Sequence, residues 1–289
     1  DGLEEELLAI GVSEAEEISR RFPKVQRRVG GYNIDALTLS DKTEGINLAH
    51  LLVGSEGTLA FSEAIELQLV RVPKHKVLGV CHFPKFYAAM EASQHLVTLG
   101  PCAVELVDQT MIDLSRENSV FRPVIERCVK GEPEALLLVE FAGESRDEQL
   151  VALKRLHELM DDLGFADSVV DAVDPQFQKD IWEVRKAGLN IMMSMKGDGK
   201  PISFIEDCAV RLEDLAEYTR RLTEIFTKHG TSGTWYAHAS VGCLHVRPVL
   251  NLKQELDVKK MRTIAEEAFA MVREYKGSHS GEHGDGLVR

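Results

Sequence analysis

The 289-residue sequence is poor in cysteine, in aromatic residues and in positive charge. Its five cysteines are scattered and never in Cys-x-x-Cys spacing, which argues against a disulfide framework or an iron–sulfur site within the chain and suits a reducing cytoplasm. A net charge of −13 argues against a nucleic-acid partner, because phosphate binding needs a basic face. No apolar run approaches the roughly 18 residues of a membrane span. We therefore expect a cytoplasmic protein, and peripheral contact with the inner face of the membrane stays open.

The sequence also lacks an initiating methionine and any signal peptide, since it begins Asp-Gly-Leu-Glu-Glu-Glu. We therefore expect it to be a piece of a longer protein. Its length allows one large domain or two small ones. The charged fraction of 28% and the apolar fraction of 44% are typical of a globular protein.

From about residue 76 onward, apolar strands alternate with amphipathic helices. The sequence predicts strands at 77–82, 103–107, 135–140, 168–172 and 202–206, and then a hairpin around residues 238 and 245. It predicts helices at 84–98, 145–163, 175–195, 211–229 and 252–275. This order favours an α+β fold in which an antiparallel sheet is covered by helices on one face.

Residues 1–75 have a different character, so we place a domain boundary between 75 and 76. We expect a helix over 3–20, a short helix over 46–52 and a strand over 65–70. Between the last two lies a loop made of Gly54, Ser55, Glu56, Gly57 and Thr58. Its backbone N–H groups could hold a phosphate or a flavin edge, although most such sequences are plain turns.

Two histidines seven residues apart mark the candidate site. With a turn at 240–243, His238 and His245 would lie directly opposite each other, with Cβ atoms roughly 4.5–5.5 Å apart. Two imidazoles and one carboxylate, with a coordination position left open, form a catalytic metal set. Glu282, which lies among glycines near the C-terminus, is the carboxylate we expect, and His283 then remains free as a general base. Histidines at this spacing are more often unrelated core or surface residues, and this alternative stays open.

These residues resemble a known family. The spacing of His238 and His245, followed by Ser-Gly-Glu-His-Gly at 280–284, is similar to the C-terminal half of the FAD-linked 2-hydroxyacid dehydrogenases. That family includes D-lactate dehydrogenase, D-2-hydroxyglutarate dehydrogenase and the flavin subunit of glycolate oxidase. Residues 47–59 are similar to the segment that closes the family's flavin domain. One departure is the turn, which is often Gly-Asp-Gly-Asn in the family and is Ser-Val-Gly-Cys here.

The resemblance implies a fold, cofactors and residue roles. Residues 76–289 would form a ferredoxin-like cap that holds the substrate, and residues 1–75 would be the C-terminal remnant of an FAD-binding domain. FAD would bind in the full-length protein with help from residues 54–58. A divalent metal, zinc by ligand type, would bind His238, His245 and Glu282. Some long members of the family carry an iron–sulfur segment, which would lie outside this chain.

The implied reaction is oxidation of a small D-2-hydroxy acid to the 2-oxo acid. His283 would take the hydroxyl proton and Arg185 would hold the carboxylate, although a surface arginine is the interpretation that the sequence alone favours. Arg247 and Lys200 are weaker candidates for the carboxylate. The specific acid and the electron acceptor stay open.

Two other functions stay open: a metal-dependent hydrolase with the same three ligands, and a non-catalytic binding module with structural histidines. Most of the family's flavin pocket precedes the segment that starts this chain. We therefore expect the chain alone to be inactive. The surface of residues 1–75 that would face the missing domain could instead bind a second copy of the chain, giving a homodimer.

Overall fold

The computed structural model describes residues 2–38 and 46–284. Within these residues, seven strands form one antiparallel sheet in the order β4-β1-β3-β2-β6-β7-β5. The strands are β1 (His75–Phe83), β2 (Ala103–Asp108), β3 (Ala135–Gly143), β4 (Val169–Ala172), β5 (Lys200–Pro201), β6 (Gly233–His238) and β7 (Cys243–Leu250). The predicted antiparallel sheet covered by helices is confirmed.

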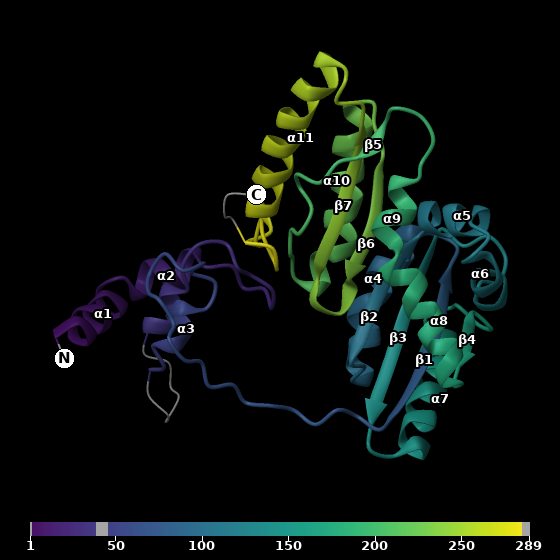
Figure 1. Cartoon of the computed structure of the whole chain (residues 1–289), viewed down its shortest axis with the longest axis horizontal. Coiled ribbons are helices and arrows are strands. Elements are labelled where there is room, and N and C mark those ends of the chain that lie inside the picture. The colour runs from purple at the N-terminus through teal and green to yellow at the C-terminus, as the bar shows by residue number, and fades with distance from the viewer. Residues whose placement is uncertain (1, 39–45, 285–289) are drawn as a thin grey trace.

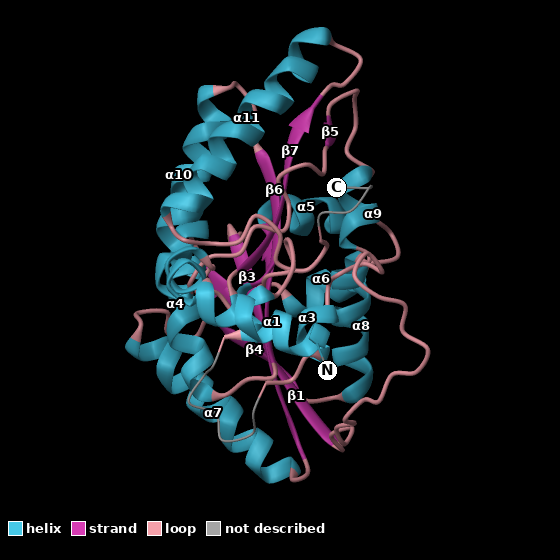
Figure 2. Ribbon diagram, turned by 90° about the vertical axis from the view of Figure 1, so that its left-hand side faces the viewer, coloured by secondary structure: helices cyan, strands magenta, loops and turns pink. Residues whose placement is uncertain are grey.

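Helices lie against both faces of this sheet, whereas the sequence predicted one covered face (Figure 2). One face packs against α4 (Phe86–Leu96), α7 (Arg146–Asp162), α10 (Leu215–Lys228) and α11 (Glu255–Glu274). The other face packs against α5 (Gln109–Glu117), α6 (Arg122–Cys128), α8 (Pro175–Lys186) and α9 (Gly188–Met193). Alternate residues of the strand β3 therefore enter two separate apolar clusters, with Leu137 in the first and Leu138 in the second.

The helices α5 and α6 of the second layer lie in a stretch where the sequence predicted no element. Asp108 begins α5, because its carboxylate accepts the backbone N–H of Met111 at 2.8 Å. The same carboxylate accepts the backbone N–H of Trp235 at 2.8 Å and so connects this helix start to β6. In the same layer, the helix predicted over 175–195 is divided at Ala187 into α8 and α9.

Two of the predicted strands are wrong. Residues 65–70 are extended but unpaired, and the side chains of Ile65 and Leu69 are 73% and 88% exposed. Strand backbone needs a neighbouring strand to satisfy its hydrogen bonds, and no described strand lies beside this segment. Residues 202–206 turn away from β7 after one further bond, from Ile202 N to Pro248 O. Prolines at 201 and 248 have no N–H, which limits the ladder there.

The N-terminal part forms a separate group of short helices beside the sheet (Figure 1). It contains α1 (Gly2–Ser13), α2 (Ala15–Arg21), the 3-10 helix η1 (Ile34–Leu37) and α3 (Ala49–Leu52). The helix predicted over 3–20 is thus interrupted at Glu14. A long extended segment leads from α3 to β1 (Figure 1). The domain boundary at residue 75 stays a prediction.

Across the described residues, no helix combines the length and the apolar character that crossing a bilayer needs.

Candidate functional site

The β6–β7 hairpin presents both histidines from one face of the sheet. The turn is a 3-10 helix, η4 (Ala239–Val241), followed by Gly242 with φ 66°. His238 therefore pairs with Cys243, and His245 pairs with Tyr236. The predicted register was wrong by two residues, so the histidines are diagonal neighbours. A shift of two keeps both on the same face, because side chains alternate with a period of two, and their ring centroids are 5.0 Å apart.

The loop after α11 brings Glu282 to these histidines. Its Oε2 atom lies 3.2 Å from His238 Nε2 and 3.7 Å from His245 Nε2. The three predicted ligands therefore meet, although they come from β6, from β7 and from a loop near the C-terminus. A tetrahedral cation with ligand bonds of about 2.1 Å has ligand atoms roughly 3.4 Å apart. The two measured separations bracket this value, so the residues fit a metal such as zinc.

Among the residues that the structure describes, two other groups of ligand atoms are close enough to hold a cation, but both include Asp207. The oxygens of that carboxylate already accept hydrogen bonds from Glu282 N at 2.9 Å and from His283 N at 2.8 Å. The Oγ atom of Ser280 donates a further bond at 2.7 Å. Since these donors occupy the lone pairs of Asp207, the set of His238, His245 and Glu282 is the better fit.

Glu105, on β2, joins the metal set to Arg185. Its Oε1 atom lies 2.7 Å from His238 Nδ1, and its Oε2 atom accepts a bond of 2.7 Å from Arg185 Nη2. The hydrogen bond to Glu105 raises the pKa of His238. A carboxylate on Nδ1 also fixes the ring with Nε2 directed at the cation position, as is usual for a histidine that binds a metal.

His245 is the most buried of the three ligands, with 3% of its side chain exposed. Burial lowers the pKa of His245 to about 3, so its imidazole is neutral near pH 7, as metal binding requires. The ring stacks on Tyr236 with the centroids 4.9 Å apart. The other ring nitrogen of His245, Nδ1, is buried and has no hydrogen-bond partner among the described residues.

His283 lies next to the metal set and is more exposed. Its ring stacks on that of His245, with the centroids 5.2 Å apart, and 29% of its side chain is exposed. Its Nδ1 atom lies 3.7 Å from a carboxylate oxygen of Glu206 and 3.7 Å from one of Asp207. Both carboxylates therefore lie on the Nδ1 side of the ring.

Arg185 is not a surface residue, because only 12% of its side chain is exposed. Its guanidinium lies 4.8 Å from the centroid of the Tyr236 ring. One nitrogen, Nη2, donates to Glu105, and Nε is buried without a partner among the described residues. The side chain that α8 contributes is therefore held in the site by Glu105, with a buried N–H donor that no described residue accepts.

The other two carboxylate-binding candidates are already engaged. Arg247 donates from Nε to Glu206 Oε2 at 2.6 Å, and its Nη2 atom forms an ion pair with the same oxygen at 2.6 Å. Nη2 also donates to the hydroxyl of Tyr236 at 3.2 Å. Lys200 donates to the backbone oxygens of Met193 and Met195.

The loop at residues 54–58 meets the C-terminal loop. A Cβ atom added to Gly284 would lie 2.4 Å from the Glu56 carboxylate, so the two segments that carry the family resemblance are adjacent in space. Ser55 is buried. Three of the loop residues have positive φ angles: Gly54 at 81°, Glu56 at 53° and Gly57 at 75°.

A cavity of about 370 Å³ opens beside the metal set. Its lining includes Arg27, Glu105, His238 and Glu282. Arg27 comes from the N-terminal part, and its Nε atom lies 3.5 Å from Glu282 Oε1. The sequence reasoning named neither Arg27 nor Glu105. For Glu105 a signal was present, because a glutamate stood among the apolar residues of a predicted strand.

Comparison with known proteins identifies relatives of the chain. Residues 72–289 match the family of FAD linked oxidases, C-terminal domain. The chain is 32% identical over 279 residues to the D-2-hydroxyglutarate dehydrogenase of Escherichia coli, which covers 92% of this chain and 27% of that protein. It is 29% identical over 258 residues to the D-lactate dehydrogenase of Archaeoglobus fulgidus, which covers 89% of this chain and 53% of that protein. The chain thus spans about a quarter to a half of these relatives.

Solved structures share the fold. An alkyldihydroxyacetonephosphate synthase aligns over 81% of this chain and 45% of its own, with a TM-score of 0.53 and 15% identity. A p-cresol methylhydroxylase with bound substrate aligns over 72% of this chain and 45% of its own, with a TM-score of 0.52 and 12% identity. At such identities the likeness concerns the fold alone. The family match is decisive, and the chain belongs to the FAD-linked oxidases through their C-terminal domain.

Proposed function

We propose that this chain is the substrate-binding part of an FAD-dependent dehydrogenase that oxidises a small D-2-hydroxy acid to the 2-oxo acid. The observation that carries the proposal is the meeting of His238, His245 and Glu282 beside two further groups, His283 and Arg185. The proteins similar to this chain include dehydrogenases of D-2-hydroxyglutarate and of D-lactate.

His238, His245 and Glu282 would hold one divalent cation, and the neutral nitrogen donors with one carboxylate favour zinc. When bound, such a cation supplies Lewis acidity, which lowers the pKa of a hydroxyl group beside it. The neutral state of His245 and the hydrogen bond from His238 to Glu105 both prepare the nitrogens for this role.

Arg185 would bind the substrate carboxylate. A guanidinium matches two carboxylate oxygens with parallel N–H donors, and its contacts with Glu105 and Tyr236 limit the movement of the side chain. This contact would hold the substrate carbon in one orientation, which is the main contribution that a positioning residue makes to rate.

His283 would act as the general base and accept the hydroxyl proton at Nε2. Its ring is adjacent to His245, and it is partly exposed, so the proton can pass on to solvent. FAD, when bound in the full-length protein, supplies the acceptor for the hydride. The loop of Gly54, Ser55, Glu56, Gly57 and Thr58 would contribute to its binding from a position close to Gly284. An iron–sulfur segment outside this chain stays a prediction.

The test uses the parent protein reconstituted with FAD and zinc and mixed, without oxygen, with D-lactate, D-2-hydroxyglutarate or glycolate. We expect at least one of these acids to bleach the visible absorbance of the flavin. The L-enantiomers of the first two acids serve as matched controls and should leave the flavin oxidised. A flavin that stays oxidised with all three acids, in a protein that contains both cofactors, would contradict the proposal. Hydrolysis of esters or amides by the same protein would favour the hydrolase instead.

A further inference from the structure

Asp207 lies beneath the loop that carries Glu282 and His283, and it takes part in no step proposed above. The residue is 2% exposed and adopts φ 83°, a left-handed conformation that is uncommon for a residue other than glycine. Its backbone N–H donates to Leu244 O at 2.6 Å, and its backbone oxygen accepts from Gly281 N at 2.6 Å. The backbone of Asp207 therefore connects β7 to the loop.

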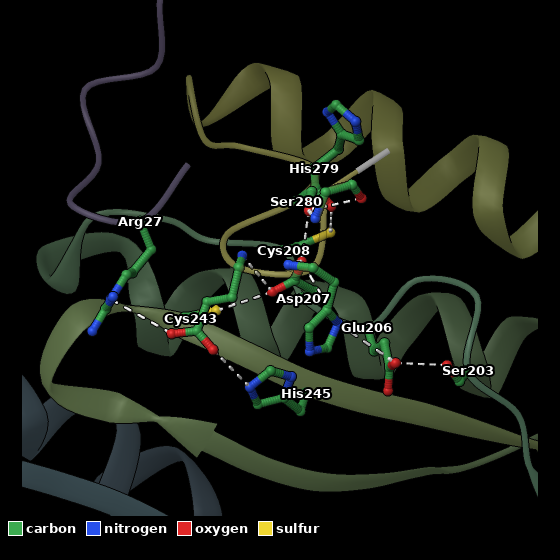
Figure 3. Close-up of polar contacts among 12 residues, drawn as sticks. Arg27, Ser203, Glu206, Asp207, Cys208, Cys243, His245, His279 and Ser280 are labelled. Atoms are coloured by element: carbon green, nitrogen blue, oxygen red, sulfur yellow. Dashed lines mark hydrogen bonds and ion pairs between the residues drawn. The ribbon is translucent and has the colours of Figure 1, made fainter. Parts of the chain in front are cut away.

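The carboxylate of Asp207 accepts four further hydrogen bonds. Oδ1 accepts from Glu282 N at 2.9 Å and from Cys243 Sγ at 3.4 Å. Oδ2 accepts from His283 N at 2.8 Å and from Ser280 Oγ at 2.7 Å. Figure 3 shows the labelled members of this group, with Asp207 between Cys243 and Ser280. Two consecutive backbone N–H groups thus point at one carboxylate, and they belong to the proposed metal ligand and to the proposed base.

Among the described residues, the carboxylate of Asp207 is the acceptor for the backbone N–H groups of both Glu282 and His283. Neither Glu282 nor His283 lies in a helix or strand. Gly281 fits closely against β7, since a Cβ atom there would lie 2.7 Å from Cys243 Sγ. Side chains on a loop hold a reactive geometry only where their backbone is fixed by surrounding contacts. Asp207 supplies such contacts through its bonds to Glu282 N and His283 N.

We propose that Asp207 is a positioning residue that holds the backbone of Glu282 and His283 so that one side chain faces the cation and the other faces the substrate. This inference rests on the proposed function for the roles of those two side chains. The anchoring of the loop by the Asp207 carboxylate does not depend on it. The two parts can therefore be tested separately.

The test compares Asp207→Asn with Asp108→Asn in the 289-residue chain. Asp108 is a matched control, because it is also buried and accepts two backbone N–H groups, those of Met111 and Trp235. An asparagine at either position turns an N–H₂ group toward a donor, so both variants should lower the melting temperature. The probe is cobalt(II), whose visible absorption reports its coordination. We expect cobalt affinity to fall about 10–100-fold in Asp207→Asn and to stay unchanged in Asp108→Asn, as for other groups that orient metal ligands.

Hydrogen–deuterium exchange of residues 278–284 provides a readout that needs no metal. Asp207→Asn should speed exchange in this peptide, and Asp108→Asn should not. If Asp207→Asn does not fold, Ser280→Ala removes one of the four donors, and it should change affinity and exchange in the same directions by less. Unchanged cobalt affinity together with unchanged exchange, in whichever variant folds, overturns the proposal. If the wild-type chain takes up no cobalt, the metal-assisted function fails, and exchange alone then decides whether Asp207 anchors the loop.

Discussion

Glu105 contacts both His238 and Arg185 with one carboxylate, so replacing it tests how the site is held together. In Glu105→Gln the amide oxygen can accept a bond from either His238 Nδ1 or Arg185 Nη2, and the N–H₂ group then faces the other donor. A hydrogen bond that involves a charged group contributes about 1.5–3 kcal/mol, and removing one partner of a buried ion pair costs about 3–5 kcal/mol. Because the Glu105 and Arg185 side chains are 11% and 12% exposed, we expect the free energy of unfolding to fall by about 2–4 kcal/mol.

The same substitution should act on metal binding in two distinguishable ways. At high pH, zinc affinity should fall about 10–100-fold, because the His238 ring is no longer held with Nε2 toward the cation. Glu105 is the main cause of the raised pKa of His238, so the pKa should decrease in the variant. A protonated imidazole cannot bind a cation, and the pH below which zinc is lost should therefore move downward. Urea denaturation measures the loss in the free energy of unfolding. Zinc titration by calorimetry at several pH values measures the fall in zinc affinity and the shift of its pH dependence.

Glu140→Gln is the matched control. Glu140 lies on the neighbouring strand β3, is 5% exposed, and accepts hydrogen bonds of 2.8 Å from Lys76 and from Trp182. It should lose comparable stability and keep its zinc affinity and pH profile. If Glu105→Gln changes zinc binding no more than Glu140→Gln does, Glu105 has no specific role at His238 and the reasoning is refuted.

Three more outcomes follow from the geometry. His283→Asn in the parent enzyme should lower kcat about 10²–10⁴-fold, and elemental analysis should show that the metal is retained. Normal turnover would exclude His283 as the general base. Arg185→Lys should raise KM and lower kcat, since a lysine cannot match two carboxylate oxygens. Unchanged kinetics would show that Arg185 does not bind the substrate carboxylate. In the metal-free chain, the unfolded state takes up a proton near pH 6.5 that folded His245 refuses until about pH 3. Stability should therefore fall as pH falls, by about 2 kcal/mol from pH 7 to pH 5. Urea melts of His245→Gln should lack that part of the slope, and an unaltered slope would show that His245 is not the cause.

The sequence predicted much of the sheet because apolar alternation is a local signal. The strands that became β1, β2, β3 and β4 were predicted close to their observed ends, as was the long helix α7. The strand predicted over 65–70 was wrong for the opposite reason, since the alternation was present and a partner strand was not. Pattern alone cannot reveal whether a partner lies within the chain.

The candidate site was likewise predictable from the sequence only in part. His238, His245 and Glu282 could be named because residue type and a family motif distinguish them. Asp207 could not be named, because its role depends on hydrogen bonds to residues more than seventy positions away. The hairpin register was missed because the turn is a 3-10 helix followed by a left-handed glycine, a geometry that the spacing of two histidines does not encode.

The charges of the site indicate that the cation binds before the anionic substrate. Among the described residues, four carboxylates and three guanidinium groups lie in or next to the metal set: Glu105, Glu206, Asp207, Glu282, Arg27, Arg185 and Arg247. With the histidines neutral, four negative and three positive charges leave the site at −1, which disfavours an anionic substrate, whereas a divalent cation would change the total to +1. Like charges in a partly buried site repel by an amount comparable to a binding free energy. We therefore expect D-lactate to bind measurably tighter to the zinc-loaded chain than to the metal-free chain, in calorimetry at fixed pH and low salt. Equal affinity in the two forms would mean that the arginines alone determine anion binding.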